Sequence, residues 1–293
     1  MNPQRMGDLF SLASVFLWSC FPIVLKLSYA SMGPLHIAAY SLAITTVALL
    51  LLLWQKHERI ILPNRSQLLQ LLLLTLITGV TFNTLLFIGF RFTSSGNGSI
   101  LLLLEVLSSY VVLSLCLKHE VVHWREGFGA VLMLCGAVIL LVHGFTGFQS
   151  GDVIITLATL LPPFGNRITQ TLRGSMHTEV ILFWRSAFSC PAFFLLAYFL
   201  EPQAPTWSPQ LFVLLVFNGF FIHGLSKILW IESIHRITVV RAASFLAVQP
   251  FFVAVLSFAL LGELVTVVQL LSVIPILIGF WMLVTRGKLR LFQ

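Results

Sequence analysis

Charged side chains inside long apolar segments are the residues of this sequence that could do chemistry. A charge within a bilayer costs from about 2.5 kcal/mol upward, so it needs a partner, a cavity or an escape to the interface. Six residues meet this description: Glu105, Glu232, Lys26, Arg167, Arg185 and Lys227. Because bases outnumber acids, the set favours binding of a molecule that carries an anionic group.

Glu105 lies near the middle of its apolar segment, residues 97–117. Its side chain is too short to reach an interface from that depth. We expect a carboxylate that faces a cavity and binds a substrate amine or carries a proton. A structural hydrogen bond or ion pair between helices is the alternative.

Lys227 and His223 are four residues apart and therefore share one face of a helix. Lys227 could bind a carboxylate or phosphate, pair with Glu232, or extend toward the interface. His223 is a candidate substrate ligand, although a buried histidine more often makes a hydrogen bond between helices.

Arg167 follows Asn166 and a pair of prolines, Pro162 and Pro163. Two adjacent prolines break or kink a helix, and interrupted helices line the binding sites of many membrane carriers. We therefore expect Asn166 and Arg167 to contact a substrate. For Arg185 a structural or gating role is expected, with Glu232 or a helix carbonyl as its partner.

Charges toward the segment ends are expected to gate the site. The candidates are Lys26, Arg91, Arg185, Arg241 and Glu232. Lys26 would close the outer side with Arg91 and His36, unless its side chain only extends to the interface. Arg241 would act on the inner side.

Aromatic side chains on the same segments could pack against an apolar part of a ligand. Trp18, Phe21 and Trp230 are the candidates. For each of them, ordinary packing between helices is the simpler explanation.

Composition indicates that these segments lie in a membrane. Apolar residues make up 58% of the 293 and charged residues 9%, against roughly 45–50% and about 25% in soluble domains. About twenty apolar residues cross a bilayer as a helix. Ten segments have that length: 8–28, 34–54, 67–90, 97–117, 124–142, 152–172, 178–200, 209–232, 239–261 and 266–285. Lipid leaves only helices or closed barrels, so an all-α integral membrane fold with ten transmembrane helices is predicted.

Basic residues predict the orientation of these helices. With the N-terminus inside, almost every Lys and Arg between segments lies on the inner side, and Arg91 is the exception. The positive-inside rule therefore places both termini in the cytoplasm. The net charge of +7 reports this orientation rather than an affinity for nucleic acid.

The second half of the chain repeats the first at an offset of 144 residues. Equivalent pairs are Gly7/Gly151, Asp8/Asp152, Asn83/Lys227 and Glu105/Gln249. We delimit the copies as residues 7–142 and 151–285, followed by a basic cytoplasmic tail, 286–293. Five helices per copy make the second copy inverted, so a site at the repeat interface can open to either side. Asn83 and Gln249 therefore join the expected substrate-binding residues.

Enzyme motifs are missing from the sequence. Its four cysteines lack metal-ligand spacing, and it has no phosphate-binding loop, nucleophile elbow or dinucleotide fingerprint. The nearest polar cluster, His119, Glu120 and His123, is typical of an interfacial loop rather than of a lipid-modifying enzyme. We expect no enzymatic activity, no cofactor and no metal.

Short motifs in the first and ninth segments carry a family resemblance. They are Trp18-Ser19-Cys20-Phe21, Arg241-Ala242-Ala243-Ser244, Gln249-Pro250 and Gly262-Glu263. In order, spacing and duplication they resemble the drug/metabolite transporter superfamily, in its ten-helix form with two EamA-type repeats. Gln249 departs from the usual Glu, and Lys118-His119-Glu120 departs from the usual Gly-Glu. The resemblance spans residues 7 to 285 and implies export of small metabolites, often amino acids, through a cavity lined by segments 1, 3, 4, 6, 8 and 9.

These features predict a secondary active transporter, an exporter or exchanger, in a bacterial-type inner membrane. Its substrate would be an amino acid or related carboxylate-bearing compound, carried by alternating access at the repeat interface. The alternatives are an exporter of apolar or cationic drugs and a passive membrane channel. Expected partners are the substrate and the bilayer, with protons as a candidate coupling ion and no nucleic acid, in a monomer or weak homodimer.

Overall fold

A computed structural model describes residues 3–57, 62–117, 124–144, 149–262 and 267–284. Within these ranges every regular element is a helix and none is a strand. The all-α prediction is therefore confirmed. The tail 286–293 and the group His119, Glu120 and His123 lie outside the described residues.

The helices follow the order of the apolar segments. The first half contains α1 (Pro3–Ser19), α2 (Phe21–Ser28), α3 (Pro34–Gln55), α4 (Arg65–Leu74), η1 (Thr75–Thr81), α5 (Phe82–Arg91), α6 (Ser95–Leu101), α7 (Leu104–Ser109), η2 (Tyr110–Cys116) and α8 (Trp124–Gly144). The second half contains α9 (Ser150–Ala158), α10 (Pro162–Arg173), α11 (Thr178–Leu200), α12 (Pro209–Phe217), η3 (Asn218–Leu225), α13 (Ser226–Ile234), α14 (Val239–Ser244), η4 (Phe245–Val248), α15 (Gln249–Leu261) and α16 (Val267–Val284).

Seven helical runs in the described part of the chain are long and apolar enough to cross a membrane. They are Pro3–Ser28, Pro34–Gln55, Arg65–Arg91, Ser95–Leu113, Thr178–Leu200, Pro209–Ile234 and Val239–Leu261. The first run begins before the expected residue 8, because polar residues extend the helix beyond its apolar stretch. The chain is therefore a multi-pass membrane protein.

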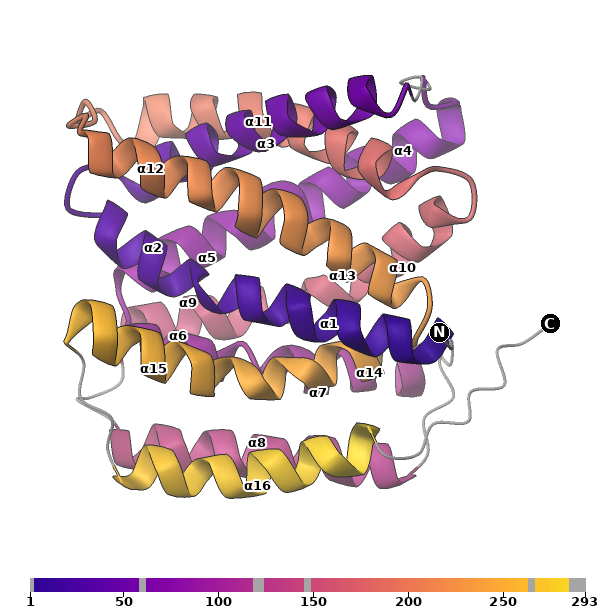
Figure 1. Ribbon diagram of the computed structural model, residues 1–293, viewed down its shortest axis with the longest axis vertical. Helices are drawn as coiled ribbons and strands as arrows, with labels where there is room; N and C mark the ends of the chain where they lie inside the picture. Colours follow the sequence, from indigo (N-terminus) through magenta and orange to yellow (C-terminus); the bar gives the residue numbers. More distant parts are fainter. Residues whose placement is uncertain (1–2, 58–61, 118–123, 145–148, 263–266, 285–293) are drawn as a thin grey trace.

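Helices from the two halves pack against each other in matched pairs. Helix α3 lies along α11, and α8 lies along α16 at one edge of the bundle (Figure 1). In addition, α1 packs on α13 while α5 packs on α9. Because the equivalents of α1 and α13 are the α9–α10 run and α5, these last two contacts are the same contact made twice, with the halves exchanged.

Several interruptions of the long helices fall at equivalent places in the two halves. A π-helical stretch precedes α5 and another precedes α13, namely η1 and η3. Tight turns come before α7 and before α15, where η4 is a 3₁₀ helix. The run α1–α2 breaks at Cys20, and the run α9–α10 breaks ahead of Pro162. The break expected at the proline pair is confirmed.

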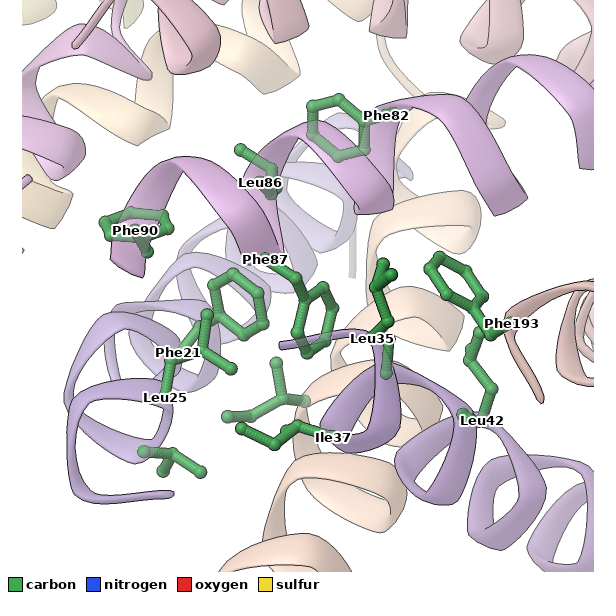
Figure 2. Packing of buried hydrophobic residues seen from close by; sticks show 14 of the residues in the cluster. Phe21, Leu25, Leu35, Ile37, Leu42, Phe82, Leu86, Phe87, Phe90 and Phe193 are labelled. Carbon is green, nitrogen blue, oxygen red and sulfur yellow. The ribbon is translucent and has the colours of Figure 1, made fainter. Parts of the chain in front are cut away.

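The main apolar core lies among α2, α3, α5 and α11. Phe21, Phe87 and Phe193 are fully buried there, and Figure 2 shows Phe21 and Phe87 facing each other across the gap between α2 and α5. Their ring centroids are 5.2 Å apart in an edge-to-face arrangement, a geometry that stabilises aromatic pairs. This core packs α2, α3, α5 and α11 together beside the polar residues described below.

Candidate substrate cavity

A cavity lies where helices of both halves converge. Its lining comprises Ser14, Val15, Trp18, Thr78, Phe82, Asn83, Glu105, Pro162, Gly165, Asn166, Thr169, Arg185, Ser226, Lys227, Trp230, Ile231 and Leu246. Most of the lining elements, among them α1, α7, α10 and α13, lie in the right half of Figure 1, on the side where the chain starts. Polar and apolar side chains share this lining, and a hollow in which several polar groups converge is typical of a small-molecule site.

Three charged residues line this cavity: Glu105, Arg185 and Lys227, here called the charged cluster. Glu105 follows a tight turn in which its own amide bonds to the Leu102 carbonyl at 3.0 Å. Lys227 stands just after the π-helical stretch η3. Local departures from α-helical winding therefore turn these two side chains toward the cavity, as π-helical turns often do at functional sites.

The charges of the cluster lie near one another without direct pairing. Lys227 interacts electrostatically with both Glu105 and Arg185, yet no ion pair joins the three in the described structure. The ammonium of Lys227 sits 3.7 Å from the ring centroid of Trp18. That cation–π contact stabilises the ammonium by about 0.5–2 kcal/mol and leaves it open to an anion.

Two amides complete the polar lining. Asn166 accepts a hydrogen bond from the indole of Trp230 at 3.0 Å, while its own Nδ2 is buried without a partner among the described residues. Asn83 donates to the Gly79 carbonyl at 2.9 Å. The Asn166 Nδ2 lies near the Glu105 carboxyl without a hydrogen bond of ordinary length. Each amide is anchored at one end and presents its other end to the site.

Aromatic rings separate the cavity from the opposite side of the bundle. Phe21, Phe87, Phe90 and His223, here called the aromatic cluster, pack with centroids 5.2–5.8 Å apart. Trp18 stacks on Phe21 at 4.7 Å and joins the cluster to the cavity wall. Neither ring nitrogen of His223 has a hydrogen-bond partner among the described residues. His223 and Phe21 thus lie behind the wall and do not line the cavity, contrary to the expectation.

Two further predicted ligands lie away from the cavity lining. Gln249 is fully buried, and both atoms of its amide lack a partner in the described structure. Arg167 is partly buried on α10. Successive helical residues point about 100° apart, so α10 turns Arg167 away when it turns Asn166 inward.

The structure corrects the partners expected for Glu232 and Arg185. Glu232 pairs with Arg173 and Arg236 and accepts a hydrogen bond from Thr178. Glu232 lies near the C-terminal end of α13, whereas Lys227 lies near its N-terminal end. Arg185 instead lines the cavity, and its guanidinium makes no hydrogen bond or ion pair with a described residue.

The remaining candidate gates lie at helix ends. Arg241 makes a two-pronged ion pair with Asp8, at 2.8 and 3.0 Å, which ties α14 to α1. Lys26 is partly buried in the last turn of α2, and Arg91 is exposed at the end of α5. His36, its expected gate partner, pairs with Glu201 at 3.0 Å.

Sequence reasoning missed several lining residues, most of them small. Ser14 and Ser226 bond to each other across α1 and α13 at 3.2 Å. Thr169 stands three residues after Asn166, a helical spacing that could have identified it. Serine and threonine hydroxyls do not indicate a cavity from sequence, because they can donate to carbonyls of their own helix, as Thr169 does to Gly165.

The EamA-like transporter family matches this chain twice, over residues 5–142 and 149–285. Because the two matches cover nearly the whole sequence, the chain belongs to the EamA-like transporter family. This is a family of membrane transporters and not of enzymes. The resemblance noted in the sequence is confirmed.

Two individual proteins resemble the chain. An uncharacterized transporter from Archaeoglobus fulgidus is 27% identical over 213 residues, which are 69% of this chain and 63% of that relative. A crystal structure of another protein overlays with a TM-score of 0.79 at 16% identity, covering 96% of this chain and 97% of the other. The first supports relatedness to a transporter, and the second supports the fold alone.

Proposed function

We propose that this protein is a secondary carrier, an exporter or exchanger, of an amino acid or related carboxylate-bearing metabolite. The observation that carries the proposal is the charged cluster, an acid and two bases that line one cavity without pairing directly. Buried charges are rare and costly. Three of them left open to a common cavity have the arrangement of a site that binds a charged molecule.

The proposed membrane arrangement has ten transmembrane helices as two inverted repeats, residues 7–142 and 151–285. Both termini lie on the cytoplasmic side of a bacterial-type inner membrane. The distribution of Lys and Arg supports this orientation. Both halves contribute to the cavity, so rocking one half against the other would open it to each side in turn.

The cavity chemistry suggests how a substrate would lie. A carboxylate would bind the Arg185 guanidinium, which offers two parallel donors, with Lys227 beside it. An ammonium group would face Glu105. The apolar remainder would pack on Trp18 and Trp230, which line the same hollow.

In this arrangement most of the elements that line the cavity lie in the cytoplasmic half of the bundle (Figure 1). The aromatic cluster occupies the other side, on α2, α5 and η3. The ring nitrogens of His223 make no hydrogen bond with any described residue. Opening toward the outside would require its rings to separate.

Exchange across proteoliposomes tests the proposal. Purified protein is loaded with unlabelled amino acids or carboxylates, and uptake of the labelled compound is measured. We expect saturable uptake that accelerates when substrate is present on the far side. Uptake that is linear with concentration and indifferent to the far side would indicate a channel instead.

Variants connect this activity to the charged cluster. Glu105→Gln, Arg185→Gln and Lys227→Gln should each reduce exchange by about tenfold or more, because each removes a charged hydrogen-bonding group from the site. Arg65→Gln removes an exposed cation at the start of α4 and serves as the matched control. Unchanged exchange in all three cavity variants would remove these residues from the mechanism. Competition by organic cations alone would favour a drug exporter.

A further inference from the structure

The charge of the cavity constrains which molecule it holds. Among the described lining residues, the charged side chains are Glu105, Arg185 and Lys227. One acid and two bases give the cavity a net charge of about +1. Moving a proton from Lys227 to Glu105 leaves this sum unchanged, so it does not depend on which of the two holds the proton.

Neither base forms a direct ion pair in the described structure. The Arg185 guanidinium has no hydrogen bond or ion pair with a described residue. Lys227 rests on the face of Trp18 and interacts only at longer range with Glu105. An uncompensated charge away from bulk water is unfavourable. A bound molecule with a net charge of −1 would therefore complement the cavity better than a neutral one.

We propose that the substrate is an amino dicarboxylate, a molecule with two carboxylates and one ammonium group. This inference rests on the proposed carrier function and narrows its substrate class. One carboxylate binds Arg185, the second binds Lys227, and the ammonium faces Glu105. Each charge of the cluster then has an opposite charge, and the occupied cavity is neutral.

The amides provide the remaining hydrogen bonds. The buried Nδ2 of Asn166 makes no hydrogen bond in the described structure, although it lies near the Glu105 carboxyl, and it is a donor that suits a carboxylate oxygen. Asn83 donates its amide hydrogen to Gly79, which leaves its carbonyl oxygen for an ammonium. Both amides line the cavity beside the charged cluster.

Three probes of nearly equal size separate the contributions of charge. L-Glutamate carries both carboxylates and the ammonium, L-glutamine lacks one carboxylate, and glutarate lacks the ammonium. In exchange with labelled L-glutamate, we expect L-glutamine and glutarate each to compete about tenfold less well than L-glutamate, since each leaves one charged group of the site unpaired.

Variants should change the preference in opposite directions. Lys227→Gln should erase the advantage of L-glutamate over L-glutamine, because the second carboxylate loses its partner. Glu105→Gln should erase the advantage of L-glutamate over glutarate. Arg65→Gln should preserve both preferences. Where a variant exchanges too slowly, the concentration dependence of its thermal stabilisation by the same three probes gives the same comparison.

The outcomes distinguish this inference from the proposed function. If L-glutamine competes as well as L-glutamate in the unmodified protein, the amino dicarboxylate inference is overturned while carriage of amino acids stands. If glutarate competes equally, the role of the ammonium is overturned. If none of the three probes exchanges and other amino acids do, the substrate class is wrong. If no amino acid or carboxylate exchanges at all, the proposed function fails as well.

Discussion

The two halves of this chain share a backbone plan and differ in their cavity chemistry. In each half a π-helical stretch precedes a helix of the cavity, η1 before α5 and η3 before α13. Each half also has a tight turn, before α7 in the first and before α15 in the second. At these equivalent places the first half has Asn83 and Glu105 in the cavity lining, whereas the second has Lys227 in the lining and Gln249 buried away from it. The two halves share a scaffold, and their differences at these positions give a cavity with an acid from the first half and bases from the second.

The same contrast holds at the helix ends. Each copy begins with Gly-Asp, and each Asp contacts the start of the fourth helix of the other copy. Asp8 forms an ion pair with Arg241, but Asp152 accepts a hydrogen bond from Thr93 at 2.5 Å. Asp8 therefore has a charged partner, whereas the partner of Asp152 is a neutral hydroxyl.

Exchanging the residues at one equivalent pair should produce the largest effect. Lys227→Asn makes the two halves alike at this position and should reduce exchange by about tenfold or more. Adding Asn83→Lys returns the cation to the cavity from the other half and should recover part of the activity. The measurement is exchange in proteoliposomes. A double variant no better than the single one would show that the two positions are not interchangeable.

Close backbone packing should differ between the π-helical stretches. In η3 a Cβ on Gly219 would lie 2.5 Å from the Ser41 carbonyl oxygen, and Thr45 donates to the Gly219 carbonyl at 2.7 Å. Gly219→Ala should therefore cost about 1–3 kcal/mol of stability through overpacking, read as a lower unfolding midpoint in detergent. The equivalent residue of η1 is Thr75, and Thr75→Ala is the matched control. Equal losses would contradict the difference.

The ionic contact should contribute more stability than its neutral counterpart. Arg241→Ala leaves Asp8 without its two-pronged partner and should lower stability by about 1–2 kcal/mol, given that Asp8 is partly exposed. Thr93→Val removes one hydrogen bond to Asp152 and should cost about 1 kcal/mol. Thermal unfolding at low and high salt compares them: only the Arg241 effect should shrink with salt.

The smallest effect is expected at Arg167. Arg167→Gln should change exchange by less than about twofold, because its side chain is absent from the cavity lining and no catalytic or binding contact is lost. Its neighbour provides the comparison: Asn166→Ala removes a lining amide that binds Trp230 and should reduce exchange more. A larger loss at Arg167 would return it to the site.

The sequence identified the fold more fully than the site. Apolar length predicts the helices, because lipid leaves a helical segment little choice, and the proline pair predicts the break before α10. Depth identified Glu105 and Lys227 as cavity residues. The depth of a residue in its apolar segment does not tell which way its side chain faces around the helix axis. For this reason Arg167 was expected to contact the substrate and Arg185 was not. The facing of α10 and α11 is set by packing between distant segments, such as Thr78 against Gly165, and no local pattern encodes it.

The paired π-helical stretches also carry a record of descent. A π-helical turn accommodates one residue more than an α-helical turn, and here it falls at equivalent places, Thr75–Thr81 and Asn218–Leu225. One insertion in a single ancestral repeat, before that repeat was copied, accounts for both. Two separate insertions after copying would have had to reach the same turn independently. By this count of events, the widened turn is older than the two-repeat protein.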